Sequence, residues 1–249
     1  MPKIAVYELS GTFRLCGDTM GVRTDNWFAS NLDDRFQWIP VAYEADFCPM
    51  QESVKQGVRK LINHIGARNG LFVLVGYSQG AGIVADVYDE IRNGSLTSRR
   101  SDFLGGVAFG NPRRQAGHTF PGCPDPGGHG IAGVRHLLCD CEDLWWDFAV
   151  PGDLAACTDD SQAGQWASAI YQTLFCDYTG DITEVVAPVG EIPDALEQGM
   201  ELVLCIENLV YGFAISGKHA DYQNPAYHPL PDDPRCCIDI ARDYINSLA

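Results

Sequence analysis

The stretch that decides the fold is LFVLVGYSQGAGIVADVYDEI, which runs from Leu71 to Ile91. It opens with the apolar run Leu71–Val75, as expected of a strand that is buried on both faces of a sheet. A Gly-x-Ser-x-Gly motif follows at once, and Ala81–Ile91 then has the spacing of a helix. This order of strand, turn and helix predicts that Ser78 lies on a sharp turn with its hydroxyl exposed, as a nucleophile requires. The alternative is a tight turn in which the serine merely caps the helix.

Strand-like and helix-like segments alternate on both sides of this stretch. Four more segments have the composition of strands: Ile4–Leu9, Phe36–Ala42, Phe103–Phe109 and Val134–Cys139. Glu52–Ala67 carries one apolar helical face, and Asp233 is expected to cap a last helix that runs from Pro234 toward Leu248. This alternation predicts an α/β fold with a central parallel sheet, helices on both faces, and a site at the carboxyl ends of the strands.

The length of 249 residues fits a single domain, residues 1–249, that carries one insertion. Asp159–Phe175 and Pro193–Tyr211 both have helical patterns, and no clear strand separates them. We therefore predict a helical insertion at about 158–216, on the rim of the sheet. This insertion either forms a cap that shapes a substrate groove or consists of ordinary packing helices.

Composition and charge exclude several classes of protein. Hydrophobic residues make up 46% of the chain, which supplies a core and excludes disorder as the main state. The net charge of −16 argues against a protein that binds nucleic-acid phosphates or docks on membranes through basic residues. The longest apolar run is too short to span a bilayer. The first residues hold no long apolar stretch with a cleavage site, which predicts production in the cytoplasm without a signal peptide.

Several other clusters of reactive residues receive a structural interpretation. The ten cysteines are irregularly spaced, which favours buried free thiols, with oxidation after release from a cell as the alternative. His118, Cys123 and His129 fit no standard zinc spacing, so we predict a surface loop there and no metal. Arg113 and Arg114 either contact a polysaccharide or pair with nearby carboxylates, and pairing is favoured.

A serine nucleophile needs an imidazole that accepts its proton and a carboxylate that orients the imidazole. In folds with this turn, the acid and then the histidine follow the serine along the chain. The chain has six histidines, at positions 64, 118, 129, 136, 219 and 228. The first four lie in helix or strand patterns or precede the candidate acids. His219 is preferred over His228 because it comes directly after the predicted insertion, whereas His228 lies in a proline-rich surface loop.

The acid is less well determined than the histidine. Carboxylates at suitable positions are Asp140, Glu142, Asp143, Asp147, Asp153, Asp159 and Asp160. Asp153 belongs to a Pro-Gly-Asp turn and Asp140 directly follows a predicted strand, and spacing alone leaves both open. An oxyanion would be held by the backbone N–H of Gln79, next to the nucleophile, and by that of Thr12, in the loop after the first strand.

Together these segments resemble the lysin B esterases of phages that infect actinobacteria containing mycolic acids, a family related to cutinases. The resemblance rests on five segments: Gly76–Ala81, Phe47–Val58, Gly110–Gln115, Gly152–Leu154, and His219 followed by Tyr222. It covers most of Lys3–Tyr222 and keeps the family's order of segments. The first loop differs, because the family often has His-Gly-Thr where this chain has Ser-Gly-Thr. The match of the Gly-Asp turn to the family's acid favours Asp153 over Asp140.

The resemblance implies a cutinase-like α/β-hydrolase with a helical cap. Such a serine esterase cleaves the ester bond between mycolic acids and arabinogalactan. The family's triad falls on Ser78, Asp153 and His219, and this chemistry needs no metal and no organic cofactor. The expected partner is mycolyl-arabinogalactan or another long-chain acyl ester. Neither nucleic acid nor a transmembrane segment is expected.

The resemblance also sets the expected place of action and the rival functions. A phage lysin B is made in the host cytoplasm and acts on the cell envelope after lysis, or it is carried on the virion. One rival is a general cutinase-like esterase or lipase that prefers short, soluble esters. The non-enzymatic rival is a virion tail protein that uses the hydrolase fold to bind the envelope. The acyl chain, the host and the oligomeric state stay open.

Overall fold

A single parallel sheet forms the centre of the computed structural model, which describes residues 2–12, 30–46, 50–141, 143–175, 218–224 and 226–248. The strands are β1 (Ile4–Leu9), β2 (Phe36–Pro40), β3 (Phe72–Tyr77), β4 (Phe103–Phe109) and β5 (Trp145–Phe148). All pairs are parallel, in the order β2-β1-β3-β4-β5. This order reverses its direction between β1 and β3, and parallel sheets bind ligands beside such a point. The predicted central parallel sheet is confirmed.

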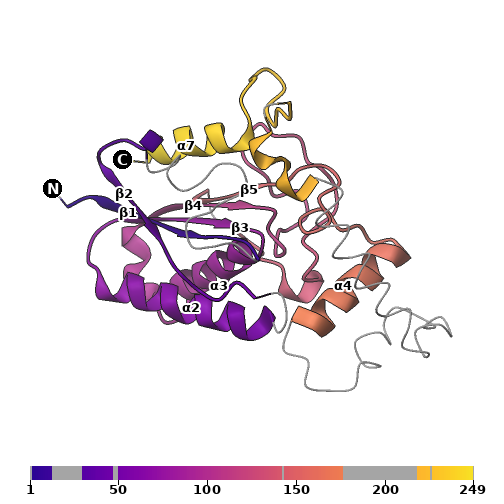
Figure 1. The fold of residues 1–249 in the computed structure, drawn as a ribbon, viewed down its shortest axis with the longest axis horizontal. Helices are drawn as coiled ribbons and strands as arrows, with labels where there is room; N and C mark the ends of the chain where they lie inside the picture. Colours follow the sequence, from indigo (N-terminus) through magenta and orange to yellow (C-terminus); the bar gives the residue numbers. More distant parts are fainter. Residues whose placement is uncertain are drawn as a thin grey trace.

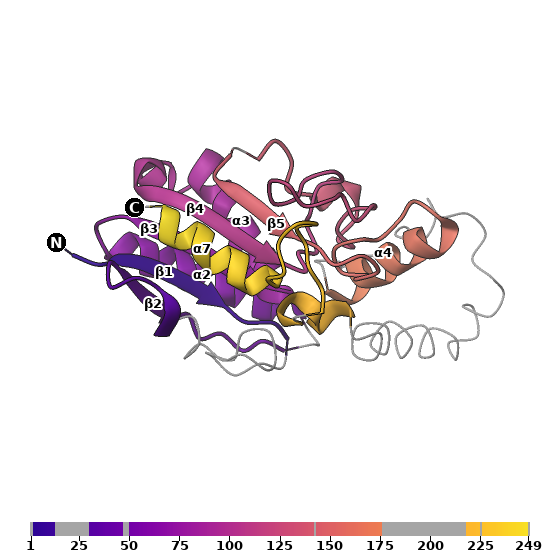
Figure 2. The same cartoon turned by 90° about the horizontal axis from the view of Figure 1, so that it is seen from above.

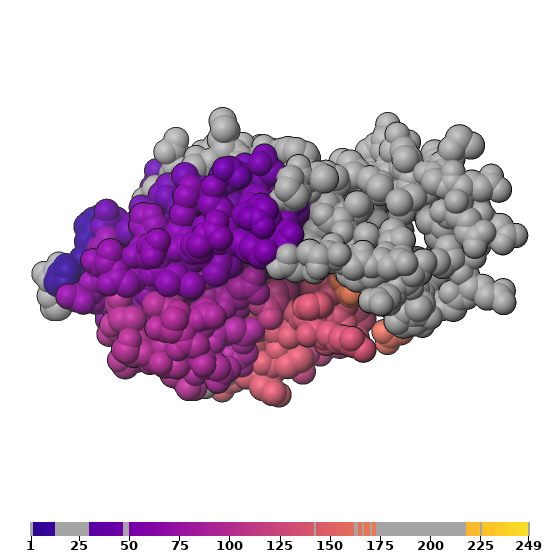
Figure 3. All heavy atoms as spheres, turned by 90° about the horizontal axis from the view of Figure 1, so that it is seen from below, coloured from indigo at the N-terminus to yellow at the C-terminus, as the bar shows by residue number. Residues whose placement is uncertain are grey.

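Helices cover both faces of the sheet (Figures 1 and 2). Helices α2 (Met50–Ala67) and α3 (Gln79–Asn93) lie on one face, and α7 (Cys237–Ser247) lies on the other. Figure 3 looks onto the first face, where α2 and its neighbouring segments cover the strands. Because both faces are covered, β1 and β3 are buried along their whole length, which explains their continuous apolar runs.

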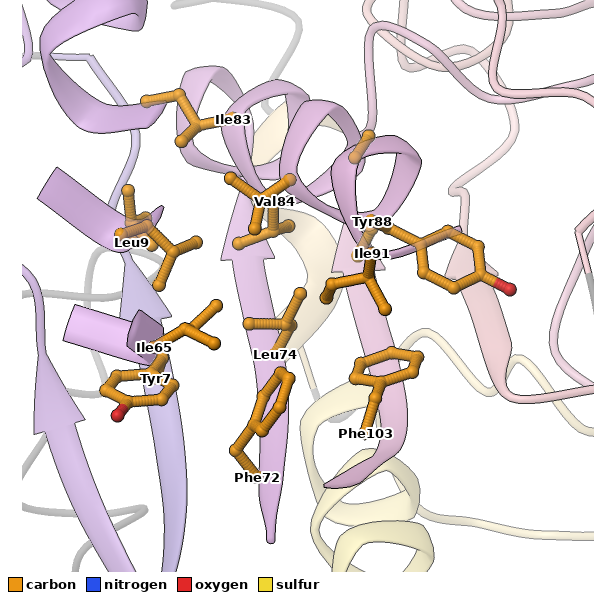
Figure 4. Close-up of a cluster of buried hydrophobic side chains, with 14 of the residues drawn as sticks. Tyr7, Leu9, Ile65, Phe72, Leu74, Ile83, Val84, Tyr88, Ile91 and Phe103 are labelled. Carbon is orange, nitrogen blue, oxygen red and sulfur yellow. The ribbon is translucent and has the colours of Figure 1, made fainter. Parts of the chain in front are cut away.

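Side chains that alternate along the strands divide the core into two layers. Figure 4 shows the layer between the sheet and helices α2 and α3, with these labelled members: Tyr7, Leu9, Ile65, Phe72, Leu74, Ile83, Val84, Tyr88, Ile91 and Phe103. On the opposite face, the intervening residues Val6, Val73 and Val75 pack in one cluster with Ile238 and Ile245 of α7. Each fully buried aliphatic side chain stabilises the fold by roughly 1.5–3 kcal/mol. The sheet is thus a rigid platform for the residues at its carboxyl edge.

The prediction of a strand at Val134–Cys139 is wrong. Residues Val134–His136 form a short 3₁₀ helix, η2, and the fifth strand is β5, further along the chain. Val134 is 69% exposed, so its apolar side chain belongs to no core. The strand β5 has only four residues, and such a short segment gives little periodic signal.

The predicted start of the last helix is also wrong. Helix α7 begins at Cys237, and Asp233 does not cap it. Asp233 Oδ1 instead accepts the backbone N–H of Arg235 at 3.0 Å and its guanidinium Nε at 2.8 Å. An aspartate that bonds to the backbone two residues ahead forms a local turn, and this turn uses the carboxylate before the helix begins.

Helix α4 (Gln162–Phe175) lies at the start of the predicted insertion. Gln172 Nε2 donates to the carbonyl oxygen of Ala132 at 2.9 Å, and Tyr171 Oη lies 4.0 Å from Met50 Sδ at the start of α2. The second predicted helix, Pro193–Tyr211, lies outside the described residues, so the cap stays a prediction. None of the helices in the described ranges is long and apolar enough to cross a membrane.

Candidate active site

The turn at Ser78 has the strained backbone that its sequence predicts. Ser78 joins β3 to α3 with φ 55° and ψ −120°, a conformation that L-residues rarely adopt and that costs about 1–3 kcal/mol. A Cβ on Gly80 would lie 2.0 Å from the carbonyl oxygen of Leu9, and one on Gly76 would lie 2.5 Å from Val84 Cγ2. Both glycines are therefore required by close packing. The backbone N–H of Ser78 donates to Phe109 of β4 at 2.9 Å, which anchors the turn to the sheet.

Three residues that are far apart in the sequence meet at this turn. His219 Nε2 lies 2.7 Å from Ser78 Oγ, and His219 Nδ1 lies 2.8 Å from Asp153 Oδ1. With Nδ1 protonated, the imidazole donates to the carboxylate and accepts the serine hydroxyl proton. The structure thus brings together the predicted Ser78, Asp153 and His219 in one hydrogen-bonded chain.

A tight turn a few residues after β5 presents Asp153. Gly152 has φ 84° and follows Pro151, and the Asp153 N–H donates to the carbonyl oxygen of Val150 at 2.9 Å. This is the geometry that a Pro-Gly pair favours at the centre of a type II turn. The Asp153 side chain is fully buried, and the N–H of Ala155 donates to its Oδ1 at 2.9 Å.

The surroundings of Asp153 keep it ionised despite its burial. Burial alone would raise the pKa of this carboxyl. The nearby His219 and the hydrogen bonds from His219, Tyr222 and Ala155 outweigh burial and hold the pKa below its usual range. A charged acceptor therefore faces the imidazole.

Tyr77, the residue before the serine, holds His219 from a second direction. Its ring stacks on the imidazole with the centroids 5.1 Å apart and an angle of 28° between the planes. Its hydroxyl donates to the backbone carbonyl oxygen of His219 at 2.7 Å. The variable position of the Gly-x-Ser-x-Gly motif thus positions the histidine, a role that the sequence analysis missed because the contact spans most of the chain.

Gly110, at the end of β4, allows the histidine and the acid to approach each other. Its φ is 58°, and a Cβ there would lie 2.8 Å from His219 Cε1 and 3.0 Å from Asp153 Oδ2. Glycine is needed at this position both for the backbone conformation and for the space. The segment Gly110–Gln115 stood out in the sequence by resemblance, but its sequence gave no sign of this contact.

Arg114, from the same segment, fixes the loops around the acid. Its side chain is fully buried, and its guanidinium donates to Ala156 O at 2.7 Å, just after the acid turn. The other carbonyl oxygens that it binds belong to Gln115, His118, Gly127 and Gly128. Its neighbour Arg113 pairs with Asp86 and Asp89 on α3, which confirms the predicted ion pairing.

The two predicted oxyanion donors lie on segments next to Ser78. Gln79 is the first residue of α3, where backbone N–H groups have no partner within the helix. Its side chain is engaged elsewhere, with Nε2 donating to Asp46 O at 2.9 Å. The loop that carries Thr12 also passes close, because a Cβ on Gly11 would lie 3.1 Å from Ser78 Cβ. The role of both N–H groups stays a prediction.

The rival candidates lie in other surroundings. The backbone N–H of Asp140 is bound by Gln115 Oε1 at 3.1 Å, and its carbonyl oxygen accepts from Arg92 at 2.8 Å. His228 is exposed. His129 Nδ1 lies 2.9 Å from the Gly130 carbonyl oxygen.

The loop around His118 and His129 contains ordinary polar contacts. His118 Nδ1 lies 2.9 Å from Asp147 Oδ2, and His129 Nε2 lies 3.3 Å from Asp160 Oδ1. Cys123 is a free thiol whose pKa burial raises to about 11. Within the described part of the chain, no group of three or more His, Cys, Asp and Glu side chains has an arrangement that could hold a metal ion.

Comparisons with known proteins give a match in structure but not in sequence. No protein-family model matches the chain. No curated protein matches its sequence either. The crystal structure of lysin B from mycobacteriophage D29 is similar with a TM-score of 0.66 and 21% identity, over 98% of this chain and 100% of that one. The chain has the lysin B fold.

The match to the lysin B fold confirms the predicted resemblance and fold class at the level of the backbone. Two further structures are similar at lower scores. A cutinase-like protein from Cryptococcus sp. has a TM-score of 0.48 and 16% identity, over 88% of this chain and 95% of that one. The catalytic core domain of acetyl xylan esterase from Trichoderma reesei has a TM-score of 0.48 and 17% identity, over 70% and 96% of the two chains.

Proposed function

We propose that this protein is a serine esterase, a hydrolase of carboxylic esters. The observation that carries the proposal is the hydrogen-bonded chain from Ser78 through His219 to Asp153, with distances of 2.7 Å and 2.8 Å. A serine in a strained turn, an imidazole within reach of its hydroxyl and a buried ionised carboxylate are the three parts of an acyl-transfer site.

The geometry supports the following reaction. Ser78 Oγ attacks the carbonyl carbon of the ester while its proton passes to His219 Nε2. Asp153 accepts the His219 Nδ1–H throughout and stabilises the imidazolium that forms. The N–H groups of Gln79 and Thr12 hold the oxyanion of the tetrahedral intermediate. His219 then protonates the leaving alcohol, and a water molecule, activated by the same histidine, releases the acid and restores Ser78.

For the substrate, we propose the ester between a mycolic acid and arabinogalactan. Two observations support this choice. The lysin B of mycobacteriophage D29 shares the fold over nearly the full length of both chains, and the sequence resemblance to lysin B esterases includes the nucleophile, acid and histidine segments. The leaving group would be a sugar hydroxyl. We further propose that the protein meets this substrate in the cell envelope, after lysis or from the virion.

The test is hydrolysis of p-nitrophenyl esters with acyl chains from C4 to C16, followed by release of mycolic acids from purified mycolyl-arabinogalactan. Ser78→Ala should lower kcat by several orders of magnitude, because removal of a triad serine leaves no nucleophile. Ser247→Ala, an exposed serine at the end of α7, is the matched control and should keep full activity.

The outcomes distinguish the proposed esterase activity from the proposed substrate. Activity on soluble esters without release of mycolic acids would indicate a general cutinase-like esterase. A wild-type protein that is inactive on every ester, or a Ser78→Ala variant that is as active as wild type, would overturn the esterase proposal. An inactive protein that binds the envelope would point to a virion binding protein instead.

A further inference from the structure

One short 3₁₀ helix carries two residues that both contact Asp153. This helix, η5 (Lys218–Gln223), contains His219 and Tyr222, which are three positions apart. Side chains at that spacing lie on the same side of a 3₁₀ helix. His219 Nδ1 binds Asp153 Oδ1 at 2.8 Å, and the Tyr222 hydroxyl donates to Asp153 Oδ2. A single turn of chain therefore engages both oxygens of the carboxylate.

Tyr222 is fixed in this position by its surroundings. Its side chain is fully buried, and its ring meets Phe109 edge-on at 5.8 Å and Tyr77 at 6.2 Å. The Val150 N–H lies 3.4 Å from its hydroxyl oxygen, so this oxygen also contacts the turn that carries Asp153. The ring cannot turn away from the carboxylate without disrupting the aromatic cluster.

The hydroxyl of Tyr222 is a permanent donor. Burial, and then the adjacent negative charge of Asp153, raise the pKa of Tyr222 well above its usual value, so the phenol stays protonated. A hydrogen bond from a neutral donor to a buried carboxylate is worth more than one at the surface. Without it, Asp153 Oδ2 would lose its tyrosine partner in the protein interior.

We propose that Tyr222 is a positioning residue, whose hydroxyl holds Asp153 Oδ2 so that Oδ1 faces His219 in the geometry that catalysis needs. This inference rests on the proposed function for its catalytic consequence, but the contact itself does not depend on it. The Tyr222 hydroxyl also draws negative charge away from Oδ1. This hydrogen bond helps to lower the pKa of Asp153, so its removal in a variant should make the carboxylate more basic and stabilise the adjacent imidazolium.

Other titratable groups also lie near this pair, including Lys218 and Asp221 of η5, which pair with each other at 3.4 Å. Among the described residues, the turn after β5 contributes Cys157, whose pKa burial raises to about 11, and β3 contributes Tyr77. The charge of Arg114 acts on Cys157 from the neighbouring loop. Burial raises the pKa of both Cys157 and Tyr222, so neither of these groups becomes charged near neutral pH.

The first experiment compares wild type with Tyr222→Phe. The variant keeps the ring and removes the hydroxyl. We expect kcat on p-nitrophenyl butyrate to fall about ten- to hundred-fold with little change in KM, since a misplaced catalytic group slows the chemical step. The acid limb of the pH profile of kcat/KM should move to higher pH. Tyr227→Phe is the matched control, because that tyrosine lies in the next loop with its hydroxyl 3.5 Å from Ala149 O. This control should change neither kcat nor the pH profile of kcat/KM.

A second measurement does not need turnover. Nuclear magnetic resonance of ¹⁵N-labelled histidine follows protonation of the His219–Asp153 pair directly, and its midpoint should rise in Tyr222→Phe. Replacement of Tyr222 by 3-fluorotyrosine, which keeps the shape and strengthens the donor, should lower it. If Tyr222→Phe does not fold, the fluorotyrosine protein decides alone.

The outcomes keep the two proposals apart. A shifted midpoint in a protein without Ser78-dependent ester hydrolysis would support the role of Tyr222 and overturn the esterase proposal. Ester hydrolysis with an unchanged midpoint and unchanged kcat in both variants would overturn the role of Tyr222 and leave the esterase proposal standing. A fall in kcat with an unchanged midpoint would mean that Tyr222 only packs, and would also overturn the inference.

Discussion

Among the described residues, two buried aspartates each bind a histidine, and only one of these two pairs meets a serine. His219 lies 2.8 Å from Asp153, and His118 lies 2.9 Å from Asp147. Both carboxylates are almost fully buried, and both follow or belong to β5. At the level of the pair itself, the two arrangements are nearly the same.

The difference lies in what surrounds each pair. His219 presents its second nitrogen to Ser78, on the strained turn. His118 stacks its ring on Trp146, with the centroids 5.7 Å apart and the planes 9° apart. Asp147 also accepts Asn111 Nδ2 at 2.8 Å and Trp145 Nε1 at 3.2 Å, so it joins β5 to the loop after β4. A buried histidine–aspartate pair therefore indicates catalysis only where a third, reactive group completes it.

Replacing the aspartate of each pair should give the largest difference between the two pairs. Asp153→Asn should lower kcat by roughly 10⁴-fold, because an amide can hold the imidazole in the wrong tautomer. Asp147→Asn should leave kcat nearly unchanged and lower the free energy of unfolding by about 1–3 kcal/mol, because an amide donor then faces other buried donors. Steady-state kinetics and urea unfolding measure both quantities. Equal losses of kcat in the two folded variants would contradict the distinction between the pairs.

A smaller effect is expected from two glycines that share a positive φ. Gly110→Ala places a methyl group 2.8 Å from His219 Cε1 and should lower kcat on the order of 10²-fold, because the imidazole must move. Gly127 has φ 82° and open space around it, so Gly127→Ala should cost about 1 kcal/mol of stability without loss of kcat. A Gly110→Ala enzyme with wild-type kcat would show that the histidine and the acid tolerate displacement.

The smallest effect concerns the stability of the protein in acid. The folded state lowers the pKa of Asp153, so this carboxylate stabilises the fold above its unfolded pKa of about 3.9. That contribution is lost as the pH falls from about 4 through the lower folded value. Urea unfolding between pH 7 and pH 3 should therefore show a weaker loss of stability in Asp153→Asn than in wild type. Parallel curves for the two proteins would contradict the pKa shift.

The turn at Ser78 is the part of the site that could be predicted best from the sequence. The apolar run of β3, two glycines and an apolar helix lie within one stretch of chain, so local sterics and burial dictate the turn. Even here one feature was hidden. Tyr77 occupies the variable position of the motif, and its contact with His219 depends on a segment 142 residues away.

The acid was not determined by spacing, and the reason is visible in the fold. The segment Val134–Cys139 has the composition of a strand but lies mostly at the surface, with Leu138 buried, whereas the true strand β5 is short and ends at Phe148, shortly before Asp153. Without β5, no pattern in the sequence shows that Asp153 rather than Asp140 lies at the carboxyl edge of the sheet. The lysin B resemblance, which compares whole segments, favoured Asp153 where periodicity could not.

The sequence by itself determined the alternation of strands and helices, the parallel sheet and the position of the serine, because each of these follows from hydrophobic periodicity and local backbone preference. The sequence pointed to His219 and, through the family resemblance, to Asp153, but only the tertiary structure shows that this pair meets the serine while His118 and Asp147 pair with each other. It also decided that Gly110 makes room for the pair and that Tyr222 contacts the second carboxylate oxygen. These contacts join segments that only the folded sheet brings together, so no local pattern encodes them.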